Sequence, residues 1–149
     1  MCHQVRRQLR DNVASISYNK ILMFLYRAQY RVLDLWDEIA RYPTPPEACL
    51  VNYYDGGAKM GLHQDKDEED FDAPVLSVSL GDTAIFLAGG RSRRDPTRKF
   101  ELKSGDVVVL GGEDRLAFHG IDRVLAGTSD LLPEGGRINL TLRRVTKPA

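Results

Sequence analysis

Two histidines and one aspartate have the types and spacing of a metal site. His63 and Asp65 stand two residues apart, and His119 follows far downstream. On a β-strand, residues two apart point to the same face, so His63 and Asp65 can hold one ion together, and the glycines just upstream favour a strand. Two imidazoles and one carboxylate leave coordination positions open, a pattern associated with non-haem iron(II) oxygenases and not with closed structural zinc sites.

The same residues allow a plainer interpretation. His-x-Asp is a frequent triplet, and Asp65 also begins an acidic run that extends to Asp72 and could simply face solvent. Within that run, Asp67 competes with Asp65 for the role of ligand. The triplet alone therefore leaves metal binding open.

A second chemical feature lies near the C-terminus, where polar and apolar residues alternate. Strand periodicity places Arg137, Asn139, Thr141 and Arg143 on one face. Fe²⁺ with one carboxylate ligand and a doubly negative 2-oxoglutarate would leave the site net negative unless a guanidinium paired with the distal carboxylate. Arg137 is the natural candidate, and Arg143 lies roughly 20 Å further along at strand rise, so we expect unequal roles. The alternative is a half-exposed edge strand whose arginines face water.

The elements that must position these groups are predicted to be mainly strands. Short apolar runs are bounded by glycines or acidic breaks, and no long helical window lies between them, which favours an antiparallel barrel or jelly roll over a parallel sheet. Apolar residues at helical spacing predict one helix over about 31–41, which Pro43 and the prolines after it end. The predicted strands cover 48–54, 59–63, 75–80, 84–87, 98–102, 106–110 and 137–145.

Composition places these elements in an ordinary globular protein. The chain has 149 residues, of which 42% are hydrophobic and 28% charged, so one domain is expected. No window approaches the roughly 18 consecutive apolar residues of a membrane span, and no cleavage-site pattern is evident, so we expect a cytoplasmic protein. Cys2 and Cys49 are too few for a disulfide framework and are expected to be reduced thiols.

The charge balance restricts how nucleic acid could be bound. With 21 Lys plus Arg against 21 Asp plus Glu, the net charge is zero, which excludes binding of phosphates by global electrostatics. The segment 91–99 carries five basic residues in nine and is the best local candidate for a phosphate contact. Its alternative interpretation is a solvated hairpin.

Seven short segments between about residues 47 and 145 form a linked pattern. They are Asn52-Tyr-Tyr54, Gly57-Ala-Lys59, His63-Gln-Asp-Lys-Asp-Glu68, Ser77-Val-Ser-Leu-Gly81, Gly105-Asp-Val-Val-Val109, His119-Gly-Ile121 and Arg137-Ile-Asn-Leu-Thr-Leu-Arg143. Their order over a hundred residues is far more specific than any one of them, and together they resemble the catalytic domain of the AlkB family of nucleic-acid dealkylases.

The resemblance implies a double-stranded β-helix, or jelly roll, over 47–149, with an N-terminal helical or irregular segment 1–46 whose helix packs on the sheet. It implies iron(II), 2-oxoglutarate and O₂ as cofactor and cosubstrates. The implied residues fall into three groups: iron ligands His63, Asp65 and His119; 2-oxoglutarate contacts Asn52, Tyr54, Arg137, Asn139 and Arg143; and substrate contacts Asp67, Arg93 and His63, the last as a stacking surface.

The implied activity is oxidative demethylation of bases such as N1-methyladenine and N3-methylcytosine in DNA or RNA, with release of aldehyde, succinate and CO₂. The expected partner is alkylated single-stranded DNA or RNA, the role is repair of alkylation damage, and the expected state is a monomer without a membrane association. A base must leave the stack to reach a buried metal.

Residues 1–46 depart from the family's lid over the flipped nucleotide. Two alternatives therefore remain: an oxygenase of a protein or small molecule, and a truncated non-catalytic remnant.

Overall fold

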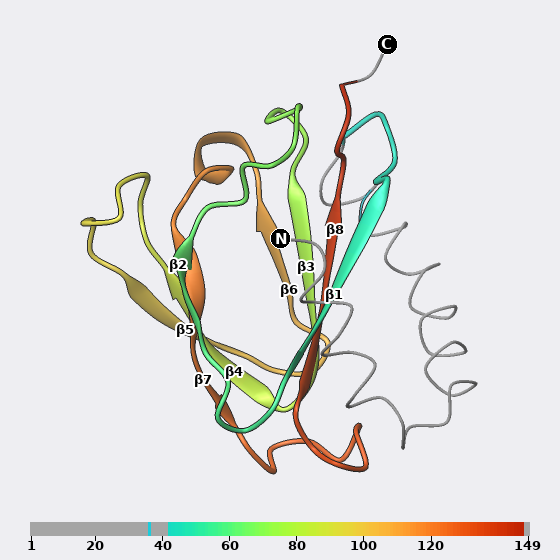
Figure 1. Cartoon of the computed structure of the whole chain (residues 1–149), viewed down its shortest axis with the longest axis vertical. Helices are drawn as coiled ribbons and strands as arrows, with labels where there is room; N and C mark the ends of the chain where they lie inside the picture. The colour runs from blue at the N-terminus through green and yellow to red at the C-terminus, as the bar shows by residue number, and fades with distance from the viewer. Residues whose placement is uncertain (1–35, 37–41, 148–149) are drawn as a thin grey trace. The chain divides into compact units, whose positions relative to one another are not determined.

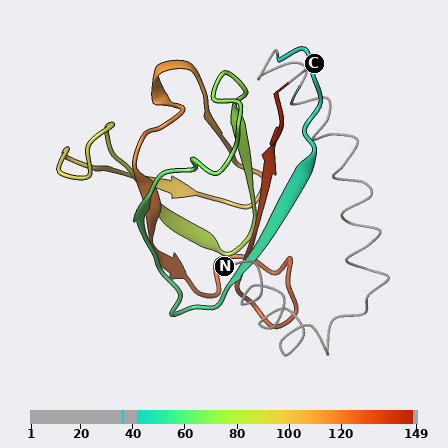
Figure 2. The ribbon, with the colours of Figure 1, turned by 45° about the horizontal axis from the view of Figure 1, so that its top comes forward.

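The computed structural model describes residue 36 and residues 42–147, and the described strands form two four-stranded antiparallel sheets. Figures 1 and 2 show the sheets lying face to face. One sheet has the order β1-β8-β3-β6 and the other β2-β7-β4-β5, which is the jelly-roll arrangement that the sequence predicted. The strands are β1 Ala48–Tyr54, β2 Met60–His63, β3 Val75–Gly81, β4 Thr83–Ala88, β5 Arg98–Leu102, β6 Val107–Leu110, β7 His119–Leu125 and β8 Arg137–Arg143.

The predicted strands match the observed ones to within one residue at their ends, with two larger differences. The prediction missed β7, which begins with His119 and pairs with both β2 and β4. It also extended β8 to residue 145, whereas the strand ends at Arg143. Just past that end, Glu47 accepts bonds from the backbone amides of Val145 and Thr146 at 2.9 and 2.8 Å, which fastens the chain beyond β8 to the start of β1.

The interior between the sheets contains an apolar half and a polar half. The apolar half is a cluster of buried side chains, namely Tyr54, Ala84, Phe86, Leu102, Ile121 and Val124. The polar half belongs to β8, which lies between β1 and β3 and is hydrogen-bonded on both sides. The interpretation of β8 as an edge strand with water-facing arginines is therefore wrong, because Arg137 is 1% exposed and neither side of the strand is open.

A tight corner between β3 and β4 fixes the start of β8. Gly81 has a φ of +88°, and a Cβ there would lie 2.5 Å from the carbonyl oxygen of Gly136. The neighbouring Asp82 is buried and accepts bonds from the backbone amides of Thr128, Ser129 and Gly136 at 2.9, 3.0 and 2.9 Å. This corner sets the register in which Gly81 faces Arg137.

The N-terminal part of the chain lies almost wholly outside the described residues. The predicted helix over 31–41 falls there, and only Trp36, which is buried, is described. Backbone contacts divide the chain into the units Met1–Arg41 and Tyr42–Ala149, and everything described below belongs to the second. Within the described residues, no helix has the length and apolar character needed to cross a membrane.

Candidate metal and cosubstrate site

The structure brings His63, Asp65 and His119 together between the sheets. Their ligand atoms all lie within 4.8 Å of one another, which is the spacing of groups that can share one metal ion. The two histidines face each other across the β2–β7 pair, where they are direct register partners with ring centroids 4.4 Å apart. Pairing between two strands distant in sequence therefore builds this half of the site.

In each imidazole, one ring nitrogen contacts a backbone carbonyl oxygen and the other points to the aspartate. Nδ1 of His63 contacts the carbonyl oxygen of Gly61, and Nδ1 of His119 that of Ala117, both at 3.0 Å. Their Nε2 atoms lie 3.8 and 3.6 Å from the carboxylate of Asp65. A carbonyl bound at Nδ1 fixes the tautomer that leaves Nε2 free for a metal. Burial lowers the pKa of His119, although the bond to Ala117 and the charge of Asp65 oppose it, so its neutral, ligating form is favoured.

Asp65 lies outside any strand, which differs from the predicted position. β2 ends at His63, and Asp65 belongs to the connection to β3, residues 64–74, called the ligand loop below. Asp65 is buried, whereas Asp67 is exposed, so only the first carboxylate reaches the histidines. The side chain of Asp65 is held by Arg143, whose Nη2 donates to Oδ1 at 2.8 Å.

The predicted 2-oxoglutarate residues share one face of the sheet, because they are cross-strand partners. Asn52 pairs with Asn139 and Tyr54 with Arg137 across β1 and β8. The amide of Asn139 donates to Ser77 Oγ at 2.7 Å and to the carbonyl oxygen of Val78 at 3.0 Å. Burial raises the pKa of Tyr54, so its hydroxyl stays protonated as a donor.

Arg137 is the most unusual residue of this face. Its side chain is buried, and only Nη2 has a hydrogen bond, to Ser79 Oγ at 3.0 Å. Nε and Nη1 are buried and have no hydrogen-bond partner among the described residues. The guanidinium carbon lies 5.1 Å from the centroid of the Tyr54 ring, and burial lowers the pKa of the group. A buried guanidinium with two donor nitrogens available can bind an oxyanion, and an unpaired buried cation is energetically costly. The group therefore favours a bound carboxylate.

Arg143 differs from Arg137 as expected. It bonds Asp65 and also Glu68, whose Oε1 accepts from Nη1 at 2.7 Å. Its Nε is the one buried nitrogen of this side chain that has no hydrogen-bond partner within the described part of the chain. Sequence reasoning did not single out Glu68 or Arg115, which bond each other at 3.0 Å and are both buried. Burial opposes ionisation of Glu68, but its bonds to the two arginines outweigh that effect and lower its pKa.

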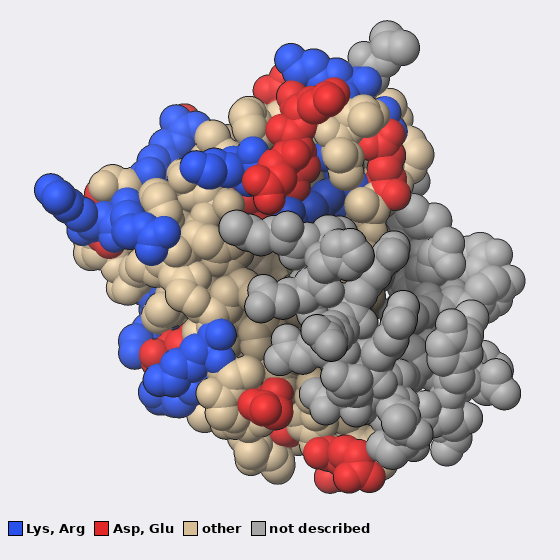
Figure 3. All heavy atoms as spheres, in the orientation of Figure 1, with Lys and Arg blue, Asp and Glu red and all other residues tan. Residues whose placement is uncertain are grey.

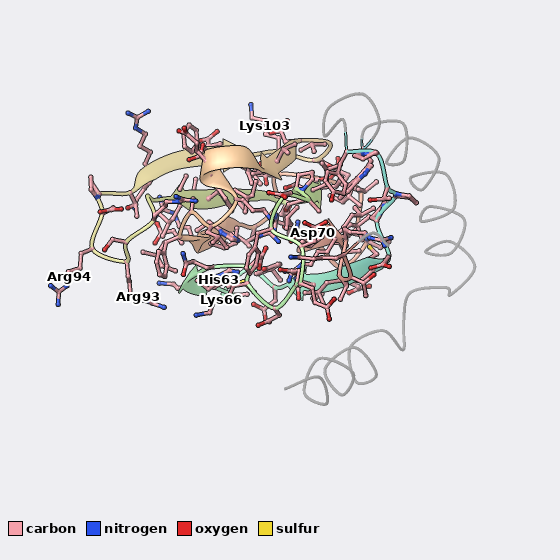
Figure 4. All side chains as sticks on the ribbon, turned by 90° about the horizontal axis from the view of Figure 1, so that it is seen from above. His63, Lys66, Asp70, Arg93, Arg94 and Lys103 are labelled. Carbon is pink, nitrogen blue, oxygen red and sulfur yellow. The ribbon has the colours of Figure 1, made fainter. Side chains whose placement is uncertain are left out.

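Two of the three predicted substrate contacts lie at the surface, whereas the third, His63, belongs to the metal cluster and is half-buried. Asp67 and Arg93 are both exposed, and the guanidinium of Arg93 stacks 5.1 Å from the ring centroid of Phe118, the residue before His119. Figure 3 shows Lys and Arg side chains gathered on the side where the β4–β5 loop projects, and Figure 4 shows Arg93 and Arg94 at the outer end of this loop. The loop contains only three of the five basic residues of the predicted segment, because Arg98 and Lys99 belong to β5.

Comparison with known proteins agrees with this geometry. The family model of the 2OG-Fe(II) oxygenase superfamily matches residues 3–143. The chain belongs to this superfamily. Its relatives within the superfamily are AlkB proteins: it is 63% identical over 113 residues to an alpha-ketoglutarate-dependent dioxygenase AlkB homolog of Caulobacter vibrioides, covering 76% of this chain and 51% of that protein. It is 53% identical over 109 residues to AlkB of Escherichia coli K12, covering 72% and 50%.

Two further likenesses extend the comparison. An Arabidopsis thaliana protein named DNA N(6)-methyladenine demethylase ALKBH1A is 41% identical over 119 residues, with 67% of this chain and 34% of that protein covered. The solved structure of OsALKBH1 superimposes with a TM-score of 0.63 at 41% identity, covering 79% of this chain and 61% of that one. The chain spans about half the length of the bacterial relatives that it matches.

The residues present fit the groups that a 2OG-Fe(II) oxygenase uses. Two imidazoles and one carboxylate match the donor preference of iron(II). The two unpartnered nitrogens of Arg137 match a carboxylate at the far end of a dianionic cosubstrate. The described residues therefore include side chains that fit the metal and side chains that fit the cosubstrate of this superfamily.

Proposed function

We propose that this protein is an iron(II)- and 2-oxoglutarate-dependent oxygenase that removes methyl groups from bases such as N1-methyladenine and N3-methylcytosine in DNA or RNA. The observation that carries the proposal is the pairing of an open three-ligand cluster with a buried, incompletely bonded arginine. A module that only bound nucleic acid would need neither feature. Bound iron would supply oxidation of the N-methyl carbon by O₂, with 2-oxoglutarate as the co-reductant, and the products would be succinate, CO₂, formaldehyde and the free base.

In this proposal, each part of the chain has one task. His63, Asp65 and His119 hold the iron, and Arg137 pairs with the distal carboxylate of 2-oxoglutarate. Asn52, Tyr54, Asn139 and Arg143 complete the cosubstrate pocket. Their positions on one face of the sheet, where Tyr54, Arg137 and Asn139 are buried, support this assignment, because water must be excluded from the reacting groups.

Nucleic acid as the substrate rests on surface chemistry and on the relatives. The exposed Asp67 would accept a hydrogen bond from the exocyclic amino group of an adenine or cytosine, and His63 would offer a ring for stacking. Arg93 and its basic neighbours would contact phosphates. The ALKBH1A relative is named as a DNA demethylase, which supports the same substrate class for this chain.

The test combines binding with turnover. Titration of iron(II) and 2-oxoglutarate without oxygen should produce a charge-transfer absorption in the parent protein and in Asp67→Ala. His63→Ala, Asp65→Ala and His119→Ala should each abolish it, since each removes one of three protein ligands. With oxygen, a methylated oligonucleotide should yield formaldehyde. Succinate formation without any formaldehyde, from a range of methylated oligonucleotides, would refute the substrate while keeping the oxygenase.

A further inference from the structure

Arg115 lies outside the proposed ligand set, yet its side chain reaches three points of the ligand loop. Nη1 donates to the carbonyl oxygen of Asp65 at 2.7 Å, and Nε donates to that of Ala73 at 2.8 Å. Nη2 bonds the carboxylate of Glu68 at 3.0 Å. One guanidinium therefore fastens the beginning, middle and end of a loop that has no strand pairing of its own.

The position of Arg115 in the chain couples the two halves of the metal cluster. It follows the short 3-10 helix Gly112–Asp114 and stands four residues before His119. Next to it, the carbonyl oxygen of Leu116 accepts a bond from Gln64 Nε2 at 2.6 Å. The segment that carries one histidine ligand thus holds the loop that carries the aspartate ligand.

The charged groups that surround Arg115 are paired and shielded from water. Arg115 and Glu68 have side chains 2% and 3% exposed. Glu68 also bonds Arg143 at 2.7 Å, and Arg143 in turn bonds Asp65 at 2.8 Å. Phe71 covers Arg115 from solvent, with its ring centroid 5.6 Å from the guanidinium carbon. The backbone and the carboxylate of Asp65 are therefore fixed separately, the first by Arg115 and the second by Arg143.

We propose that Arg115 is a positioning residue for the metal, and that it holds Asp65 at the ligand distance from His119 through the ligand loop. This inference rests on the proposed function. Arg115 touches neither metal nor cosubstrate, and it acts by keeping the aspartate in place before the ion arrives. Groups that orient ligands in this way typically change metal affinity by about 10- to 100-fold when they are removed.

The experiment uses Co²⁺ as the probe, because its visible absorption reports the ligand geometry without turnover. Arg115→Lys keeps the charge but replaces the three nitrogens that bond Ala73, Asp65 and Glu68 by one. Glu68→Gln keeps the size but loses the charge. Both should bind Co²⁺ about tenfold more weakly or worse, with altered absorption bands. In the metal-free variants, amide hydrogen exchange should accelerate in residues 65–73 and remain unchanged in β3 and β8. Arg123→Lys, on the exposed part of β7, is the matched control and should resemble the parent.

The outcomes separate the two proposals. A parent that does not bind Co²⁺ would contradict the proposed function itself. A parent that binds, with folded variants of equal affinity, would overturn only the role of Arg115, and faster exchange without weaker binding would reduce it to a structural contact. Weaker binding without faster exchange would also overturn it, because the effect would then be purely electrostatic. If Arg115→Lys does not fold, the same criteria apply to Glu68→Gln.

Discussion

Replacement of Arg137 by methionine should separate cosubstrate binding from folding. The substitution retains a long side chain and removes the guanidinium, whose Nε and Nη1 are buried and have no hydrogen-bond partner in residues 36 and 42–147. A hydrogen bond to a charged group is worth about 1.5–3 kcal/mol, so two of them to one carboxylate amount to about 3 kcal/mol at the lower end. Since 1.4 kcal/mol is a factor of ten, the dissociation constant of 2-oxoglutarate should rise by at least about a hundredfold.

Stability should respond quite differently. Arg137→Met loses the bond to Ser79 and the contact with the Tyr54 ring, each worth about 1 kcal/mol. It also removes a buried, incompletely paired charge, and replacing such a charge by an apolar side chain is often neutral or stabilising. The two effects oppose each other, so the unfolding midpoint of the metal-free protein should change by less than about 8 °C.

The assay is calorimetric titration of 2-oxoglutarate into the Co²⁺-loaded protein without oxygen, alongside thermal unfolding followed by circular dichroism. Arg123→Met is the control, because Arg123 is an exposed arginine on the other sheet, with 59% of its side chain accessible. The reasoning fails if Arg137→Met binds 2-oxoglutarate within about threefold of the parent. It also fails if the variant cannot fold, since the guanidinium would then be a structural group.

Three further predictions concern stability and substrate binding. The hydrogen bonds to Glu47 lower its pKa from 4.5 to about 2, so the stability that it contributes is complete above pH 4.5 and is lost as the pH falls towards 2. In Glu47→Gln, the thermal unfolding midpoint should therefore depend less on pH between 4.5 and 2. Gly81→Ala should destabilise more than Gly105→Ala in chemical denaturation, because both have positive φ but only the first Cβ would meet a backbone oxygen, 2.5 Å away. Formaldehyde yield should fall steeply with salt while succinate yield does not, and Arg93→Ala should weaken that salt dependence; equal responses of both products would contradict phosphate contacts by this loop.

The sequence was sufficient for the parts of the site that local patterns encode. Alternation along Arg137–Arg143 predicted the polar face of β8, and the His-x-Asp spacing predicted the first two members of the cluster. The same spacing was right for a different reason than expected. Asp65 does not share a strand with His63, because β2 ends at His63, yet its carboxylate lies 3.8 Å from Nε2 of that histidine.

Long-range pairing accounts for what the sequence did not predict. β7 contains a glycine and two charged residues, so its strand character comes from pairing with β2 and β4 and not from its own composition. Glu68 stands in an acidic run for which solvent exposure was the alternative interpretation. It is buried, because Arg115 and Arg143 lie 47 and 75 residues away in sequence but bond it in space. Neither partner is visible in a local window.

The arrangement of charges explains why Arg137 and Arg143, on the same face of β8, have different roles. Asp65, Glu68, Arg115 and Arg143 form a closed set of two acids and two bases, so Arg143 is already compensated before any ligand binds. Arg137 has no acidic partner among the described residues, and it leaves one positive charge in excess at the other end of β8. A divalent cation and a dianion neutralise each other. The remaining positive charge then lies where the distal carboxylate is proposed to bind, which favours a cosubstrate with two carboxylates over one with a single carboxylate. Pyruvate and similar monocarboxylic 2-oxo acids should accordingly bind far more weakly than 2-oxoglutarate to the parent protein, and the difference should shrink in Arg137→Met. An unchanged preference in that variant would show that another group recognises the second carboxylate.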